Sequence, residues 1–288
     1  FFALKGFKDA TELAGALGKE AVQARFAAIR DEYQADLQAS IRLAMQNHNI
    51  DYLPGAVELG DFDPTSTTVA VTPAAAQDLL PKGALQRTFE RYWQESEARR
   101  TGARSWTAFT PYELRTVGTF ARLGDRARAL AMLDWFFLQQ RPPAWNHWAE
   151  VVHRDADAPR FIGDMPHTWV GSDFIRSLTD LLAYEREADD ALVIAAGVSP
   201  AWVTGSGLRV QGLSTHYGTL GYTMRQQGDS VLVTFEDGLR IGRGGLVIRS
   251  PLERPLRGAT VDGRLSHASG EWLALPRIPR TVVLRYAQ

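Results

Sequence analysis

The sequence predicts a mainly α protein, built as an α/α toroid that is complete or partial and is followed by a small antiparallel β-sandwich. Two observations predict this fold class. Apolar residues recur at helical spacing through most segments before about residue 190. Beyond it, short β-rich runs alternate with turn signals such as Asp237-Gly238 and Asp262-Gly263. We therefore expect a helical toroid-like domain over residues 1–196 and a β-sandwich-like domain over residues 197–288.

The helices are predicted from apolar periodicity and from their end signals. The clearest runs from Lys19 to Asn47, a stretch that contains neither Gly nor Pro. Further helices are expected from about Thr72 to Leu80, Leu85 to Arg99, Thr110 to Leu123, Asp125 to Gln140, and Gly171 or Ser172 to Glu187. Short connections alternate with long ones rich in Gly and Pro, which suits helical hairpins arranged in a ring. A closed six-hairpin ring needs more helices than these, so half a ring is one interpretation.

The strands are predicted from β-rich runs that are bounded by turn residues. The linker 197–207, GVSPAWVTGSG, marks the start of this region. The runs are Leu208 to Val210, Gly221 to Met224, Val231 to Phe235, Leu246 to Ile248, Glu271 to Leu275 and Thr281 to Tyr286. Short strands with regular turns are typical of a small sandwich.

Composition excludes several classes of protein. The 288 residues carry a formal net charge of −1, which gives no electrostatic reason to expect nucleic acid or an anionic membrane as a partner. No apolar run reaches the ~18 residues that span a bilayer. The chain has no cysteine, so it can form neither a disulfide nor a thiolate metal site. It opens on Phe1, which indicates a processed chain or a piece of a longer one.

One stretch, residues 141–176, carries most of the functional interest. It holds three of the eight tryptophans (Trp145, Trp148, Trp169) and three of the six histidines (His147, His153, His167). A loop of this length inside a compact domain is usually functional or disordered, and its aromatic content argues against disorder. Aromatic rings beside acids and imidazoles are typical of a sugar site, because rings stack on C–H faces while polar groups bond to hydroxyls. The alternative is a structural connection whose tryptophans close one end of a helical bundle.

Acidic residues in two other segments are candidates for catalysis. Asp61 and Asp63 lie two apart in ELGDFD, where in an extended loop they would point the same way and raise the pKa of one carboxyl. Asp63 precedes Pro64, so the alternative for it is an Asx turn that bonds its own backbone. Glu113 is either a catalytic acid at a helix start or a capping-box partner for Thr110.

Within the long loop, Glu150 is the preferred general acid. It follows Trp148 in WNHWAEVV, where burial among aromatic rings would raise its pKa. Asp164 and His167, in GDMPHTW, are candidates for sugar hydroxyls or proton transfer, the alternative being that they hold the loop together. Catalytic roles are thus predicted for Glu150, Asp61 and Glu113, and substrate-binding roles for Trp145, Trp148, Asp63, Asp164, His167 and Trp169.

No metal or other cofactor is predicted. His147 and His153 are six residues apart, and no HExxH spacing occurs. The glycines at 242, 244 and 245 match no phosphate loop, and a G-x-S-x-G nucleophile elbow is missing.

Four segments, PGAVELGDFDPTST, TPYELR, RPPAWNHWAEVV and GDMPHTWVGSDFIRS, carry a family resemblance. They resemble the C-terminal region of large bacterial proteins labelled as discoidin (F5/8 type C) domain proteins, over most of residues 20–235. The predicted architecture is also similar to the (α/α)-barrel glycosidases of the glucoamylase-like and α-L-rhamnosidase-like kinds. The resemblance implies a carbohydrate ligand, further domains in a parent protein, and two carboxyl groups that flank a sugar pocket.

Two functions therefore follow from the sequence. The first is a glycoside hydrolase-like protein acting on an oligo- or polysaccharide by carboxylate acid/base catalysis. The second is a non-catalytic carbohydrate-binding or scaffolding module of a larger protein. Under the first, we expect the loop residues to converge with Asp61 and Glu113 on one rim of the helical domain. The compartment is open, with a secreted or periplasmic location favoured.

Overall fold

The computed structural model describes residues 1–156 and 160–287. They form two compact units, each made of two separate stretches of the chain. Unit 1 comprises Phe1–Thr119 and Leu138–Val170, and unit 2 comprises Phe120–Phe137 and Gly171–Gln288. The chain thus leaves unit 1, contributes one segment to unit 2, returns for the long loop and then completes unit 2.

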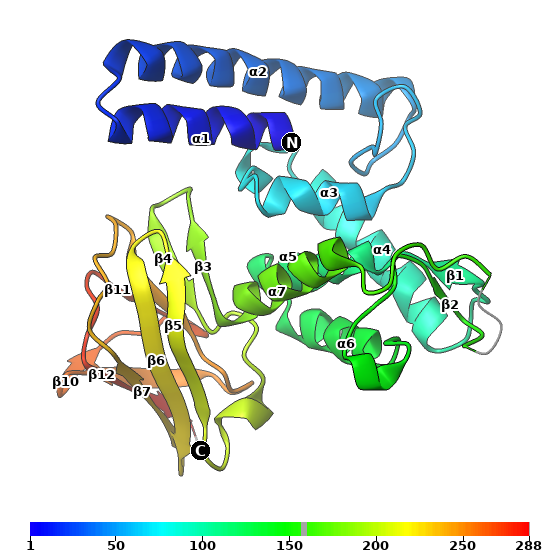
Figure 1. Ribbon diagram of the computed structural model, residues 1–288. Coiled ribbons are helices and arrows are strands. Elements are labelled where there is room, and N and C mark those ends of the chain that lie inside the picture. Colours follow the sequence, from blue (N-terminus) through cyan, green and yellow to red (C-terminus); the bar gives the residue numbers. More distant parts are fainter. Residues whose placement is uncertain (157–159, 288) are drawn as a thin grey trace. The chain divides into compact units, whose positions relative to one another are not determined.

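Unit 1 opens with a helical hairpin. Helices α1 (Phe2–Ala16) and α2 (Glu20–Asn47) run antiparallel, and the chain reverses between them (Figure 1). Gly18 in this turn has φ +64°, a conformation that glycine adopts at low cost. The predicted helix from Lys19 to Asn47 is confirmed, because its periodicity is uninterrupted over several turns.

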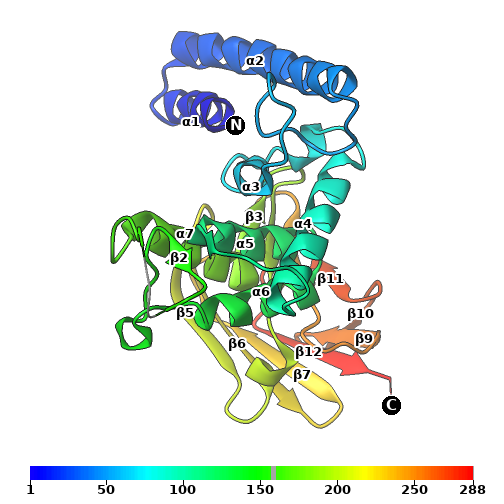
Figure 2. The ribbon, with the colours of Figure 1, turned by 90° about the vertical axis from the view of Figure 1, so that its right-hand side faces the viewer.

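The middle of unit 1 holds two helices that begin on well-defined signals. Helix α3 (Pro64–Val71) starts with Asp63, whose side chain accepts a hydrogen bond from the backbone N–H of Ser66. Helix α4 (Ala84–Arg100) follows the short 3₁₀ turn η1 (Gln77–Leu79) and is seen along its length in Figure 2. The predicted helix over 72–80 is wrong: Thr72 is extended and ends α3. Asp63 and Pro64 offer the same cap-and-proline signal nine residues earlier, and the helix begins there.

The remaining elements of unit 1 are short. They are β1 (Ala108–Phe109), η2 (Pro111–Leu114), η3 (Pro143–Trp145) and β2 (Val152–His153). Strand β1 pairs antiparallel with β2, so the stretch before η2 is tied to the long loop. Helices α5 (Arg115–Arg122) and α7 (Thr168–Leu182) each begin in unit 1 and end in unit 2.

Unit 2 is built on two sheets. Its helix α6 (Arg126–Phe137) is preceded by Asp125, which accepts from Arg128 N–H. The six-stranded sheet has the order β10-β9-β12-β7-β6-β5 and the four-stranded sheet the order β11-β8-β4-β3. The strands are β3 (Ala183–Arg186), β4 (Ala191–Ile194), β5 (Leu208–Thr215), β6 (Gly218–Gln227), β7 (Ser230–Phe235), β8 (Gly245–Arg249), β9 (Leu256–Val261), β10 (Arg264–Ser266), β11 (Trp272–Leu275) and β12 (Thr281–Tyr286). A 3₁₀ turn, η4 (Pro200–Val203), links β4 to β5.

One apolar core joins the two sheets of unit 2. Tyr222 and Val233 of the larger sheet are buried in the same cluster as Ile194 and Ile248 of the smaller one. Strands β4 and β8 are buried at every position, which is typical of strands covered on both faces. They are also the parallel pair in sheets that are otherwise antiparallel.

The fold class differs from the prediction in its balance. The described residues contain seven α-helices and two sheets of six and four strands, so the chain is mixed α and β rather than mainly α. The strands of the two larger sheets also begin at Ala183, before the expected boundary at residue 197. The ring closure of the helices into a toroid stays a prediction.

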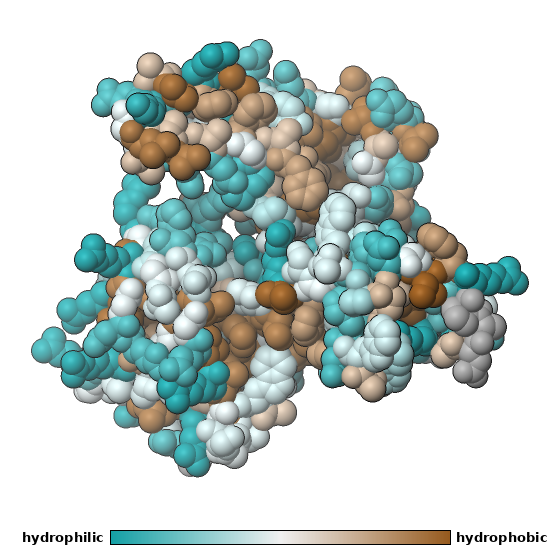
Figure 3. Space-filling model, in the orientation of Figure 1, coloured by the Kyte–Doolittle hydropathy of each residue, from teal (hydrophilic) through white to brown (hydrophobic). Residues whose placement is uncertain are grey.

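Large apolar side chains reach the surface of the α1–α2 hairpin (Figure 3). Leu13 and Leu17 are 61 % and 63 % exposed. None of the described helices combines the length and apolar character needed to cross a membrane.

Candidate functional site

A pocket of about 450 Å³ lies in unit 1, against one side of α4. Its lining combines aromatic rings, carboxylates and guanidinium groups. The lining residues are Phe62, Asp63, Pro64, Thr65, Tyr92, Glu95, Ser96, Arg99, Arg104, Ser105, Trp106, Thr107, Ala108 and Glu113. We call this space the α4 pocket. Its volume suits one or two sugar rings or another small polar ligand.

Glu113 is fixed at one wall of the α4 pocket. Arg99 Nη1 donates to Glu113 Oε1 at 2.9 Å, and Arg99 Nη2 contacts Glu113 Oε2. The hydroxyl of Tyr92 donates to the same Oε2 at 2.8 Å. Burial raises the pKa of Tyr92 well above its ordinary value, so its phenol stays a donor. A forked guanidinium and a phenol thus hold both carboxylate oxygens of Glu113 in place.

Glu95, a second acid of the pocket, is more accessible than Glu113. It lies one turn before Arg99 on α4, and its side chain is 38 % exposed. Arg91 Nε donates to Glu95 Oε1 at 3.1 Å, and Arg104 Nη1 lies 3.4 Å from Oε2. Both arginines are themselves exposed, so these ion pairs are solvated and easily exchanged.

Asp63 lines the pocket, but both of its carboxylate oxygens bond to Ser66 of α3. Its Oδ1 accepts from Ser66 N–H at 3.0 Å, and its Oδ2 contacts the Ser66 hydroxyl. This is a helix N-cap, which is close to the structural alternative predicted for it. Asp61 is not among the pocket-lining residues, and it accepts from Ala56 N–H at 2.8 Å. Asp61 and Asp63 therefore each have a backbone partner of their own.

The aromatic wall of the pocket is Trp106. Its ring is half-buried and meets Phe109 edge-on, with centroids 5.7 Å apart. The guanidinium carbon of Arg99 in turn lies over the Phe109 ring, 5.0 Å from the ring centroid. Trp106 is thereby held in position while it borders the cavity, as a stacking ring in a sugar site must be.

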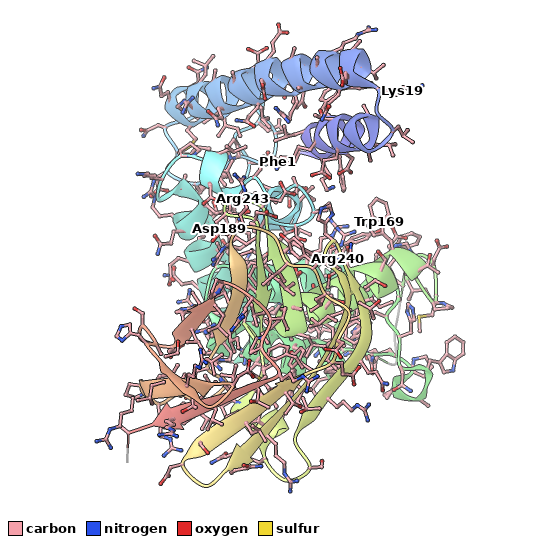
Figure 4. The ribbon with its side chains drawn as sticks, turned by 90° about the vertical axis from the view of Figure 1, so that its left-hand side faces the viewer. Phe1, Lys19, Trp169, Asp189, Arg240 and Arg243 are labelled. Atoms are coloured by element: carbon pink, nitrogen blue, oxygen red, sulfur yellow. The ribbon has the colours of Figure 1, made fainter. Side chains whose placement is uncertain are left out.

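The tryptophans of the long loop have three different environments. Trp148 is buried, 1 % exposed, and so serves the core. Trp145 is 59 % exposed and borders a second, largely apolar pocket of about 500 Å³. Trp169 is 53 % exposed and stands out from the first turn of α7 (Figure 4). Of the three, only Trp148 is buried as a structural tryptophan would be, and its predicted role in substrate binding stays a prediction.

Around Trp169 lies a group that we call the loop cluster: Tyr112, Glu150, Asp164, His167 and Trp169. Tyr112 meets Trp169 edge-on at 5.5 Å between centroids, and its hydroxyl lies 2.6 Å from His167 Nε2. One donor atom from each of Glu150, Asp164 and His167 lies within 4.8 Å of the others.

The predicted site residues are thus divided among places within unit 1. Asp63 and Glu113 border the α4 pocket, Trp145 borders the apolar pocket, and the loop cluster holds Glu150, Asp164, His167 and Trp169. The 3₁₀ turn η2 connects two of these places, because it carries both Tyr112 and Glu113.

Sequence reasoning missed four pocket residues: Glu95, Arg99, Arg104 and Trp106. Glu95 and Arg99 look like ordinary solvated positions of an amphipathic helix. The pattern that could have indicated them is the spacing of three and four residues between Tyr92, Glu95 and Arg99, which places all three on one helix face. Comparison with family models and with curated protein sequences gives no match to this chain.

Proposed function

We propose that the α4 pocket binds a carbohydrate. The observation that carries this proposal is the combination, in one cavity of about 450 Å³, of the Trp106 ring with three acidic and two arginine side chains. A sugar presents an apolar C–H face to a ring and hydroxyls to charged groups, so both halves of its chemistry have partners here.

In this proposal the sugar ring stacks on Trp106. The carboxylate of Glu95 accepts from hydroxyl groups, while Arg104 donates to hydroxyl oxygens. Glu113 keeps a fixed position because Arg99 and Tyr92 hold it, so it orients the ligand with little loss of side-chain entropy on binding.

Titration calorimetry of the full chain with a panel of neutral oligosaccharides tests the proposal. The panel should contain α- and β-linked glucans, mannans, xylans and rhamnose-containing oligomers. Trp106→Ala is expected to weaken the binding that is found by roughly five- to tenfold, because a stacked ring contributes on the order of 1 kcal/mol. The matched control is Trp169→Ala, which removes an exposed tryptophan of the same unit outside the pocket. Equal weakening by both variants, or no binding across the panel, contradicts the proposal.

Glycoside hydrolysis is the second candidate, and the presence of Glu95 and Glu113 in one pocket favours it. Glu95 in its protonated form would give its proton to the glycosidic oxygen as the C–O bond breaks. The Glu113 carboxylate would bond to the anomeric carbon, or take a proton from an attacking water, according to the separation of the two groups.

Release of reducing ends from the bound oligosaccharide distinguishes the two candidates. Hydrolysis predicts turnover by the wild-type chain and its loss in Glu95→Gln, with binding retained because the substitution keeps the shape and removes the proton. Binding without turnover leaves the chain a carbohydrate-binding module. In either case the proposal extends to a parent protein of the discoidin-labelled kind, in which further domains complete the helical ring.

A further inference from the structure

Apart from the α4 pocket, we infer that Glu150, Asp164 and His167 form a binding site for one divalent metal ion of the zinc class. Glu150 and Asp164 are 14 residues apart, and Asp164 and His167 are 3 apart, so the three do not form a compact metal-binding sequence motif. The fold nevertheless brings one donor atom from each within 4.8 Å of the others. Donor atoms at about 2.0–2.2 Å from one Zn²⁺ ion lie no more than about 4.4 Å apart, so small side-chain movements close the site.

The backbone holds the three donors together. Glu150 N–H donates to Asp164 O at 3.1 Å, and Val151 N–H donates to Ile162 O at 3.0 Å. His167 N–H donates to Trp148 O at 3.2 Å. Backbone hydrogen bonds therefore join the segments 148–151 and 162–167 side by side. The backbone positions that carry the three donor side chains are fixed relative to one another.

Tyr112 orients the imidazole toward the carboxylates. Its hydroxyl lies 2.6 Å from His167 Nε2, while His167 Nδ1 lies 3.7 Å from Asp164 Oδ2. If Nε2 carries the proton and donates to the Tyr112 oxygen, the lone pair of Nδ1 faces Glu150 and Asp164. A hydrogen bond at the outer nitrogen is the usual way in which proteins orient a metal-binding histidine. The His167 side chain is only 11 % exposed, so its neighbours limit the movement of the ring.

Gly163 leaves room for Glu150. It lies beside Asp164 with φ +64°, and a Cβ atom at this position would collide with the carboxyl group and Cβ of Glu150. The absence of a side chain at 163 is thus what allows Glu150 to reach the other two donors.

The donor set indicates the class of ion. One imidazole nitrogen and two carboxylate oxygens suit Zn²⁺ and similar borderline ions. Ca²⁺ takes six to eight oxygen ligands and Mg²⁺ prefers an all-oxygen octahedron, so neither fits this set. Two carboxylates balance the charge of the ion. Three protein ligands leave a position for water or for an oxygen of a ligand, while Asp164, 82 % exposed, gives access from solvent.

The test is titration calorimetry of the chelator-treated, dialysed full chain with ZnCl₂ at neutral pH, with CaCl₂ and MgCl₂ in parallel. We expect one Zn²⁺ per chain and weaker binding of the other two ions. Glu150→Gln, Asp164→Asn and His167→Ala should each weaken Zn²⁺ binding about tenfold or more. The control His267→Ala removes an exposed histidine of unit 2 and should change nothing.

Gly163→Ala adds a test that removes no donor. It should weaken Zn²⁺ binding because the new methyl group displaces Glu150. Gly102→Ala is the matched control, since Gly102 also has positive φ (+79°) but would place its Cβ in open space. Zn²⁺ affinity that is absent in the wild type, equal in all variants, or lower than that for Ca²⁺ overturns the inference. Circular dichroism of each variant shows whether it is folded. If His167→Ala does not fold, the isosteric variants Glu150→Gln and Asp164→Asn carry the test.

Discussion

Arg99 Nη1 donates to Glu113 Oε1 at 2.9 Å, and the two side chains are only 13 % and 14 % exposed. This pair holds Glu113, a predicted catalytic acid, in a fixed position at the wall of the α4 pocket. It also makes Glu113 a point at which the stability of unit 1 can be tested.

Glu113→Gln should destabilise the protein. The substitution leaves the Arg99 guanidinium poorly solvated and without its anion, and breaking a buried pair costs roughly 2–4 kcal/mol. Urea denaturation followed by circular dichroism measures the change. Glu97→Gln is the control, because the Glu97–Arg100 pair is more exposed and its loss should cost under about 1 kcal/mol. Equal losses of stability in the two variants would show that the Arg99–Glu113 pair contributes no more to the free energy of unfolding than an exposed pair does.

Asp190 should make the stability of unit 2 depend on acid pH. Its pKa is lowered because its carboxylate accepts from Arg243 N–H at 2.9 Å and from the Tyr217 hydroxyl at 2.8 Å. The folded pKa thus lies below the unfolded value of about 3.9. The stabilisation is present above that value and is lost as pH falls through the folded pKa. Figure 4 labels Asp189, which precedes Asp190 in the sequence, and Arg243, whose N–H donates to Asp190.

Asp190→Asn should therefore flatten the loss of stability below about pH 4, measured as the urea midpoint between pH 7 and pH 3. Asn is a suitable replacement because Asp190 has φ +58°, which Asn adopts readily. Asp237→Asn, which removes an exposed carboxylate, corrects for the general change in charge. A steeper acid slope in Asp190→Asn than in the wild type would contradict the assignment.

Gly245→Ala should weaken the four-stranded sheet. Gly245 has φ +71°, and an added Cβ would collide with the carbonyl oxygen of Leu275 on the paired strand β11. Backbone strain and this collision together should cost roughly 2–4 kcal/mol in the free energy of unfolding. Gly263→Ala has the same strain, φ +81°, with open space around the new atom, and should cost about 1 kcal/mol. Similar losses in both would remove the steric part of the explanation.

Long helices and turn-bounded strands could be predicted from the sequence, because their signals are local. Helix α2 matches its prediction since neither Gly nor Pro interrupts its period, and the turn at Asp262-Gly263 does join two strands. Strands β3 and β4 were missed. The residues up to Arg186 extend the helical pattern of α7, but β3 pairs with β4 and β4 pairs with β8, so sheet pairing decides their structure instead.

The candidate site was predicted in part for the same reason. Asp63 and Glu113 were found because acids in long connections stand out in a sequence. Arg99, the partner that fixes Glu113, lies 14 residues away on a regular helix, and nothing local marks it. The loop cluster depends on a hydrogen bond between Tyr112 and His167, 55 residues apart, which only the folded chain reveals.

The most direct test of the proposed function observes the tryptophan indole N–H signals of the ¹⁵N-labelled chain during titration with the best-bound oligosaccharide. Single Trp→Phe variants at 106, 145 and 169 assign the three signals. The α4 pocket predicts that the Trp106 signal shifts with the concentration dependence of binding, while the signals of Trp145 and Trp169 stay in place. Movement of the Trp145 or Trp169 signal with an unchanged Trp106 signal would place the sugar on the long loop and contradict the account.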